Sequence, residues 1–157
     1  MAADMENIKA DEAKMKKINS LYEGEDSYLI FSINEERYTL KGSGILQIIN
    51  EPKIRKLPFV PSFIEGIINV HGTPYAAVNT LKMNNEKDSN VSGTNYIVLK
   101  RDDDQFSIHV SNIELFFEPE KEDIQEGKVR YKQNFIPIFE TDKIEEKLVK
   151  ALSKEVL

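Results

Sequence analysis

Two histidines, His71 and His109, are the side chains of this sequence best suited to acid–base or metal chemistry. His71 stands between a β-branched run and Gly72 in the stretch FIEGIINVHG, where it could be a ligand, a general base or a neutral group. His109 lies in the stretch FSIHV, where alternation should point it to the face opposite Ile108. Neither has a carboxylate or a third ligand at a recognisable metal spacing, so we interpret His109 as a half-exposed strand residue.

No other motif in the sequence indicates catalysis. There is no cysteine, and phosphate-binding loops, nucleophile elbows and zinc-protease motifs are absent. The three consecutive aspartates at 102–104 could bind a cation, but such a run in a hairpin turn is more often solvated. We therefore expect a protein without enzyme activity, cofactor or metal.

The net charge and the apolar content of the chain limit the classes of partner that it can bind. The 157 residues carry a net charge of −6, which argues against binding to a nucleic-acid backbone. Basic residues gather at Lys53, Arg55 and Lys56, in a segment broken up by prolines, which we interpret as a solvated loop or a partner-facing edge. The lack of cysteine, signal peptide and long apolar run favours a cytoplasmic protein with no direct membrane insertion.

The spacing of apolar residues predicts a mainly β domain between two helices. Residues 1–22 have the period of an amphipathic helix, and residues 142–157 form a second one, with Asp142 and Glu145 as a capping pair and Ile144 and Leu148 on the apolar face. Residues 63–66 are expected to form one helical turn. Short strands are expected at 27–33, 37–40, 44–50, 67–70, 75–81, 95–100, 105–110, 113–118 and 134–140. Many short strands at even spacing are typical of barrels or a sandwich.

The order of these segments resembles the CheW-like family, the coupling proteins of bacterial chemotaxis. The resemblance is carried by YLIFSINEERYTL, by ILQIINEPKIRKLPFVPSFIEGIINVHGTPYAAVN and more loosely by YIVLKRDDDQFSIHV. The family pattern in the central piece is Pro-x-Phe-x-x-Gly, an apolar pair, then Asn-Leu-Arg-Gly. The matching residues here are Pro61, Phe63, Gly66, Asn69 and Gly72.

This resemblance implies two intertwined five-stranded SH3-like β-barrels over residues 27–157, preceded by a helical extension at 1–26. It also implies a non-catalytic adaptor that bridges the signalling tip of methyl-accepting chemoreceptors to the regulatory domain of the histidine kinase CheA. The implied receptor-binding residues are Ile45, Gln47, Gly66, His71 and Gly72. The implied kinase-binding residues are Asn34, Arg37, Thr73, Tyr75 and Asn79.

Three positions depart from the family pattern by losing charge. His71 stands where the family has arginine, Gln47 where it has glutamate, and Asn79 where it has aspartate. In the family the first two form a charge pair, and removing both members together avoids an uncompensated charge. We hypothesise that His71 is a neutral hydrogen-bonding replacement that Gln47 can reach; the alternative is an ordinary turn residue.

Two other functions stay open at this point. One is a divergent paralogue that keeps the scaffold but binds a different protein. The other is a small-molecule sensor that uses a closed, largely apolar cavity between the lobes.

Overall fold

The computed structural model describes residues 26–86, 89–102 and 104–156, with side chains as far as Lys150. The expected helix at 1–22 lies outside these residues. The described strands are β1 (Tyr28–Ile33), β2 (Glu36–Lys41), β3 (Ile45–Asn50), β4 (Ile54–Arg55), β5 (Ile64–Val70), β6 (Thr73–Val78), β7 (Asn95–Leu99), β8 (Phe106–Val110), β9 (Asn112–Phe117), β10 (Ile124–Gln125), β11 (Lys128–Tyr131) and β12 (Asn134–Pro137). The helices are α2 (Thr80–Met83) and α3 (Asp142–Val156), with 3-10 turns at Gly42–Gly44 and Lys121–Asp123.

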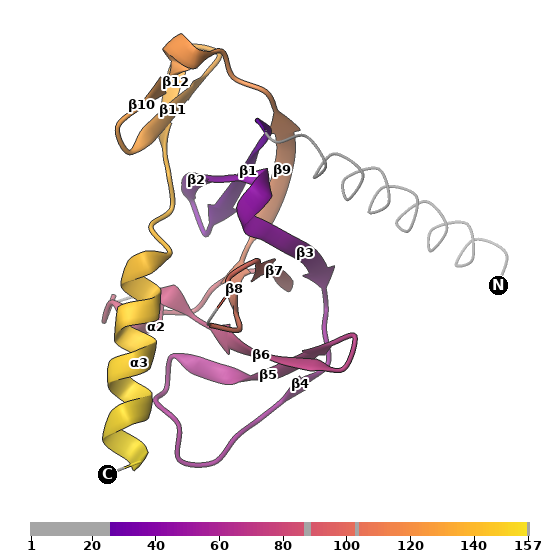
Figure 1. Cartoon of the computed structure of the whole chain (residues 1–157), viewed down its shortest axis with the longest axis vertical. Helices are drawn as coiled ribbons and strands as arrows, with labels where there is room; N and C mark the ends of the chain where they lie inside the picture. The colour runs from indigo at the N-terminus through magenta and orange to yellow at the C-terminus, as the bar shows by residue number, and fades with distance from the viewer. Residues whose placement is uncertain (1–25, 87–88, 103, 157) are drawn as a thin grey trace, which may run out of the picture.

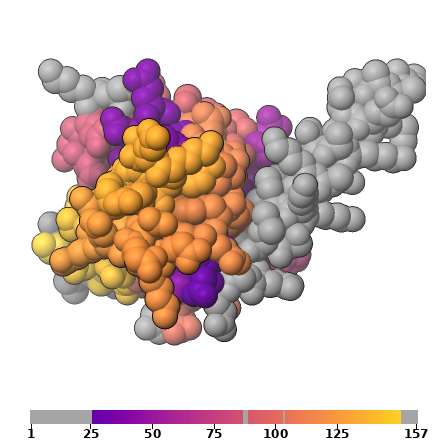
Figure 2. All heavy atoms as spheres, turned by 90° about the horizontal axis from the view of Figure 1, so that it is seen from above, coloured from indigo at the N-terminus to yellow at the C-terminus, as the bar shows by residue number. Residues whose placement is uncertain are grey.

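The strands form three sheets that make up two lobes (Figure 1). The first lobe contains the sheet β2-β1-β9 and the sheet β10-β11-β12, which are linked by a bridge between Thr39 and Ile138. Viewed from above, strands β9 to β12 cover the centre of this end of the molecule (Figure 2). The second lobe is a six-stranded sheet with the order β3-β7-β8-β6-β5-β4, in which only β6 and β8 are parallel.

From β1 to β12, the chain passes between the lobes twice. Strands β1 and β2 lie in the first lobe, β3 to β8 build the second lobe, and β9 returns to the first. The expected mainly β, intertwined fold is confirmed. The hydrogen-bonded sheets contain three, three and six strands, whereas we expected two closed barrels of five.

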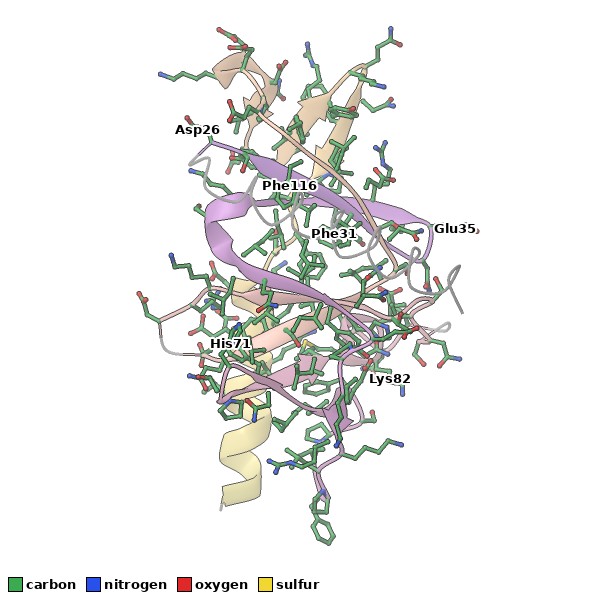
Figure 3. The ribbon with its side chains drawn as sticks, turned by 90° about the vertical axis from the view of Figure 1, so that its right-hand side faces the viewer. Asp26, Phe31, Glu35, His71, Lys82 and Phe116 are labelled. Atoms are coloured by element: carbon green, nitrogen blue, oxygen red, sulfur yellow. The ribbon has the colours of Figure 1, made fainter. Side chains whose placement is uncertain are left out.

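A single large core joins the lobes and the C-terminal helix. Phe31 of β1, which is fully buried, lies near the middle of the molecule (Figure 3). It belongs to the same apolar cluster as Ile97 and Phe106 of the second lobe and Leu148 of α3. All six residues of β1 are buried, because this strand has β2 and β9 beside it and the core beneath. The lobes are thus held together by apolar burial as well as by the crossing chain.

The C-terminal helix forms where its apolar period predicted. Ile144 and Leu148, one turn apart, are 4% and 6% exposed. Asp142 and Glu145, the expected capping pair, have a different partner. Their carboxylates both accept hydrogen bonds from Arg101. That contact ties the first turn of α3 to the residue that follows β7 by two positions.

The prediction for residues 63–66 was wrong. This segment, expected as a helical turn, leads into strand β5, because Ile64 and Gly66 pair with β6 around a bulge. The strand expected at 75–81 ends at Val78, and its last two residues lie in α2.

No strand was expected at residues 124–131, which contain β10 and β11. Strand β10 pairs with β11, and β11 pairs with β12.

Candidate partner-binding surfaces

His71 and Gly72 form the two-residue turn between β5 and β6. Val70 pairs with Thr73 across it, and the two turn residues have φ values of 50° and 86°. Positive φ at both positions is the signature of a type I′ turn, which matches the twist of a hairpin. His71 is exposed at one side of the molecule (Figure 3). The tight turn expected from the flanking glycine is therefore present.

Gln47 and His71 both belong to the second lobe, as the hypothesis of a coupled replacement requires. Gln47 lies on β3 opposite Val98 of β7. No hydrogen bond joins the Gln47 and His71 side chains in the described part of the chain. His71 is thus a turn residue here, and the expected contact between the two neutral side chains is not formed.

Two of the five expected receptor-binding residues are buried. Ile45 is 4% exposed and belongs to the main core, so its side chain faces away from solvent. Gly66 is also buried, with φ at +151°. A Cβ atom there would lie 2.5 Å from the carbonyl oxygen of Arg55, so glycine is required for β4 to approach β5. Ile45 and Gly66 support the surface rather than form it.

Hydrogen bonds to the loop that precedes β7 hold the turn between β1 and β2 in place. The Asn34 side chain donates to the carbonyl of Asn90 (2.9 Å) and accepts from the amide of Ser92 (2.8 Å). Arg37 of β2 donates through two nitrogen atoms to one carboxylate oxygen of Glu114 on β9, at 3.1 and 2.8 Å. Both residues come from the expected kinase-binding set, and both lie in the first lobe.

The other expected kinase-binding residues lie elsewhere. Thr73 and Tyr75 are on β6, beside the turn that carries His71. Asn79 is 4% exposed and caps α2 by accepting from the amide of Lys82. The structure therefore divides this set. Glu35, in the β1–β2 turn, and His71 lie on opposite sides of the molecule (Figure 3).

The second lobe also holds a polar cluster that the sequence pattern did not predict. One carboxylate oxygen of Glu65 on β5 accepts from the Tyr96 hydroxyl of β7, and the other lies 2.7 Å from Nδ1 of His109 on β8. Nε2 of His109 lies 2.8 Å from the carbonyl oxygen of Gly93. The rings of Tyr96 and His109 are stacked, with centroids 4.4 Å apart.

The contacts of His109 favour its protonated form. Its two partners, the Glu65 carboxylate and the Gly93 carbonyl, are acceptors, and an imidazolium can donate to both from its two ring nitrogens. Burial alone would lower the pKa of His109, but the hydrogen bonds to Glu65 and Gly93 outweigh it and raise the pKa. Burial would likewise raise the pKa of Glu65, yet the hydrogen bonds from His109 and Tyr96 lower it. Burial first, and then the Glu65 carboxylate, raise the pKa of the Tyr96 hydroxyl.

This cluster corrects our interpretation of His109 as a half-exposed residue without a nearby carboxylate. Its side chain is 12% exposed, and its partner Glu65 is 44 positions away. Strands β5 and β8 lie on either side of β6, so the pairing depends on sheet order rather than on any local spacing.

Across residues 26–86, 89–102 and 104–156, no group of three or more His, Cys, Asp or Glu side chains could hold a metal ion. A surface groove of about 670 Å³ lies where β2, the end of β7 and the start of α3 meet. Its walls include Leu40, Leu99 and Phe139 as well as Lys41, Lys100 and Asp142. It is open to solvent, unlike the closed cavity expected of a small-molecule sensor.

Comparison with known proteins identifies the family. The model of the CheW-like domain matches residues 27–143. This chain belongs to the CheW-like domain family. It is 25% identical over 100 residues to the chemotaxis protein CheW of Treponema pallidum (strain Nichols), a match that covers 60% of this chain and 59% of that protein. Its fold resembles that of the scaffolding protein TtCheW from Thermoanaerobacter tengcongensis, with a TM-score of 0.64 and 18% identity over 74% of this chain and 90% of the other.

Within this CheW-like domain, the two lobes correspond to the intertwined architecture that the resemblance implied. Within the described residues, no helix is long and apolar enough to cross a membrane. The Glu65, Tyr96 and His109 cluster lies inside the matched range.

Proposed function

We propose that this CheW-like protein is a non-catalytic cytoplasmic scaffold that couples chemoreceptors to the histidine kinase CheA. Family membership carries the proposal, since the family model covers both lobes. The shape of the molecule supports it, because a bridging protein needs two separated surfaces. The His71 turn and the Glu35 turn lie on opposite sides (Figure 3), so two partners would not compete for the same space.

The receptor-facing surface is the exposed His71–Gly72 turn, with Gln47 of β3 in the same lobe. The kinase-facing surface is the β1–β2 turn with Arg37. Asn34 holds that turn rigid through the loop at 90–92, and a rigid surface loses less conformational entropy on binding. Thr73 and Tyr75 are assigned to the receptor side because they adjoin the His71 turn.

Co-sedimentation with receptor assemblies and purified CheA tests this function. The wild-type protein should appear in the pellet when receptor assemblies and CheA are both present. It should stay in the supernatant when both are left out. A variant with Gln47→Glu and His71→Arg together should be incorporated more efficiently, because it restores the two charges of the family pattern. If the wild-type chain binds neither partner, it is a paralogue with another partner.

Charge reversal tests the kinase surface separately. Arg37→Glu should weaken binding to CheA about tenfold while receptor binding is unchanged. Lys121→Glu is the matched control, since Lys121 is an exposed basic residue of the same lobe outside the proposed surface. Equal effects of the two variants would contradict the assignment of this surface.

A further inference from the structure

The segment from Lys53 to Val60, which we call the basic tip, has charge opposite to that of the whole chain. Lys53, Arg55 and Lys56 are exposed, and none forms a salt bridge within the described residues. The chain as a whole carries a net charge of −6. Uncompensated positive charge concentrated in four residues of an acidic protein attracts a negatively charged partner.

A nearly fully exposed aromatic ring lies in the same segment. Phe59 is 92% exposed, whereas Val60 and Phe63 pack against the main core. Pro58 and Pro61 restrict the backbone on either side. Phe59 itself has φ at 59°, a conformation that is uncommon for a non-glycine residue. The loop is anchored on the core and still leaves the ring in solvent, and an exposed anchored aromatic is typical of a protein contact.

The basic tip borders a groove along the edge of the six-stranded sheet. The groove has a volume of about 780 Å³, and its apolar lining comes from Ile49, Ile54 and Ile67 with two prolines. Lys53 and Arg55 are also among its lining residues. Strand β4 is the last strand of this sheet, so one side of its backbone faces no further strand of the sheet. In Figure 1, the β4–β5 connection lies at the end of the molecule opposite β10–β12.

We propose that this edge binds an extended, acidic segment of a partner protein. The segment pairs with the free side of β4, places apolar side chains in the groove, and sets its carboxylates against Lys53, Arg55 and Lys56. Phe59 contacts an apolar recess on the same partner. A groove beside an open strand edge fits an extended polypeptide, whereas a lipid surface would touch only the tip of the loop. The proposal goes beyond the coupling role proposed above, because neither of the two surfaces assigned to that role includes this segment.

Site-specific photo-crosslinking in the encoding organism tests the proposal. The full-length chain would carry benzoylphenylalanine in place of Phe59, and a second form would carry it in place of Phe135. Phe135 is a matched control, because it is a surface phenylalanine, 38% exposed, that stacks against basic side chains in the first lobe. We expect position 59, and not position 135, to capture a protein that mass spectrometry maps to an acidic segment.

Purified components then decide whether the captured contact is the proposed one. Phe59→Ser and the double variant Lys53→Glu with Lys56→Glu should each weaken binding of the captured acidic segment at least about tenfold. Phe135→Ser should leave it unchanged, and wild-type binding should weaken as salt is raised. Capture of lipid, capture of a second copy of this chain, no capture specific to position 59, or an affinity unaffected by the charge reversal would each overturn the proposal. All four positions are on the surface, so unchanged melting temperatures should accompany these variants.

Discussion

The two histidines of this protein lie in the same lobe but in opposite settings. His71 is exposed in a type I′ turn, and no hydrogen bond to its ring occurs within the described residues. His109 is 12% exposed, stacked on Tyr96, and bonded through both ring nitrogens. The His71 turn is defined by the positive φ values of its backbone, whereas the Glu65, Tyr96 and His109 cluster is held together by hydrogen bonds between side chains. Sequence position alone favoured His71 as the functional residue, yet His109 has the more specific chemical environment.

The largest effect should come from removing Glu65. Glu65→Ala leaves an imidazolium and a tyrosine hydroxyl without their acceptor, and should lower the free energy of unfolding by about 3 kcal/mol. Glu65→Gln should cost clearly less, because it keeps one acceptor oxygen. Urea denaturation of both variants measures the difference. A loss below about 1 kcal/mol for Glu65→Ala would show that the cluster is no more important than an exposed ion pair.

Two glycines should differ in the cost of replacement by alanine: Gly66, next to Glu65 of the polar cluster, and Gly72, in the β5–β6 turn. Gly66→Ala places a Cβ atom against the Arg55 carbonyl and should cost more than about 2 kcal/mol. Gly72→Ala meets no atom within 4 Å and should cost only about 1 kcal/mol, from its positive φ. Thermal and urea unfolding give both values. Equal costs would mean that β4 does not approach β5 as closely as the structure shows.

The pH dependence of stability should follow the titration of Glu65 and His109 in the polar cluster. His109 has a raised pKa, so its contribution is fully present below its ordinary value of about 6.5 and is lost as the pH rises through the folded-state value. Glu65 has a lowered pKa, so its contribution is present above its ordinary value of about 4.5 and is lost as the pH falls through the folded-state value. The contribution of this cluster to the free energy of unfolding is therefore greatest between about pH 4.5 and pH 6.5.

Deprotonation of His109 removes one of its two ring donors, a loss worth about 1 kcal/mol. Unfolding free energies of the wild type and His109→Gln, measured from pH 5 to 9, should show this alkaline decrease in the wild type alone. His71→Gln serves as the control and should retain the decrease. If His109→Gln retained it as well, another group would be responsible.

The smallest effect should come from substitutions in the β5–β6 turn. Asparagine and glycine accept positive φ, so His71→Asn and His71→Gly should change stability by less than about 0.5 kcal/mol. His71→Val should cost about 1 kcal/mol, because a β-branched residue is strained in this conformation. Melting temperatures of the three variants test this. A larger loss with asparagine would indicate a role for the imidazole that the turn geometry does not explain.

Local patterns in the sequence predicted the elements well where neighbouring residues fix the structure. The strand at β1 and the helix at α3 follow from continuous apolar residues and from the spacing of Ile144 and Leu148. Segment 63–66 was mistaken for a helical turn, because the short stretch shows no alternation long enough to reveal a strand. Strands β10 and β11 were missed because they are short and lie among charged residues, and their order comes from pairing with each other and of β11 with β12.

The candidate surfaces were predictable only in part. The spacing of Gly66, Asn69 and Gly72 led to the family, and the exposed turn at His71 is where that spacing placed it. Burial of Ile45 and the capping role of Asn79 were not foreseen, since nothing in their local sequence distinguishes a surface residue from a core residue.

The family, the mainly β character, the C-terminal helix and the tight turn at Gly72 could be read from the amino-acid sequence, because each depends on residues close together along the chain. The fold was needed to see that His109 pairs with Glu65, which predicted site residues are buried, and that Lys53, Arg55 and Lys56 form no salt bridge within the described residues. Those properties depend on contacts between distant strands, such as the approach of Glu65 to His109 across β6. The energy of a charge is set by the partners and the solvent around it, and the order of strands in a sheet determines both.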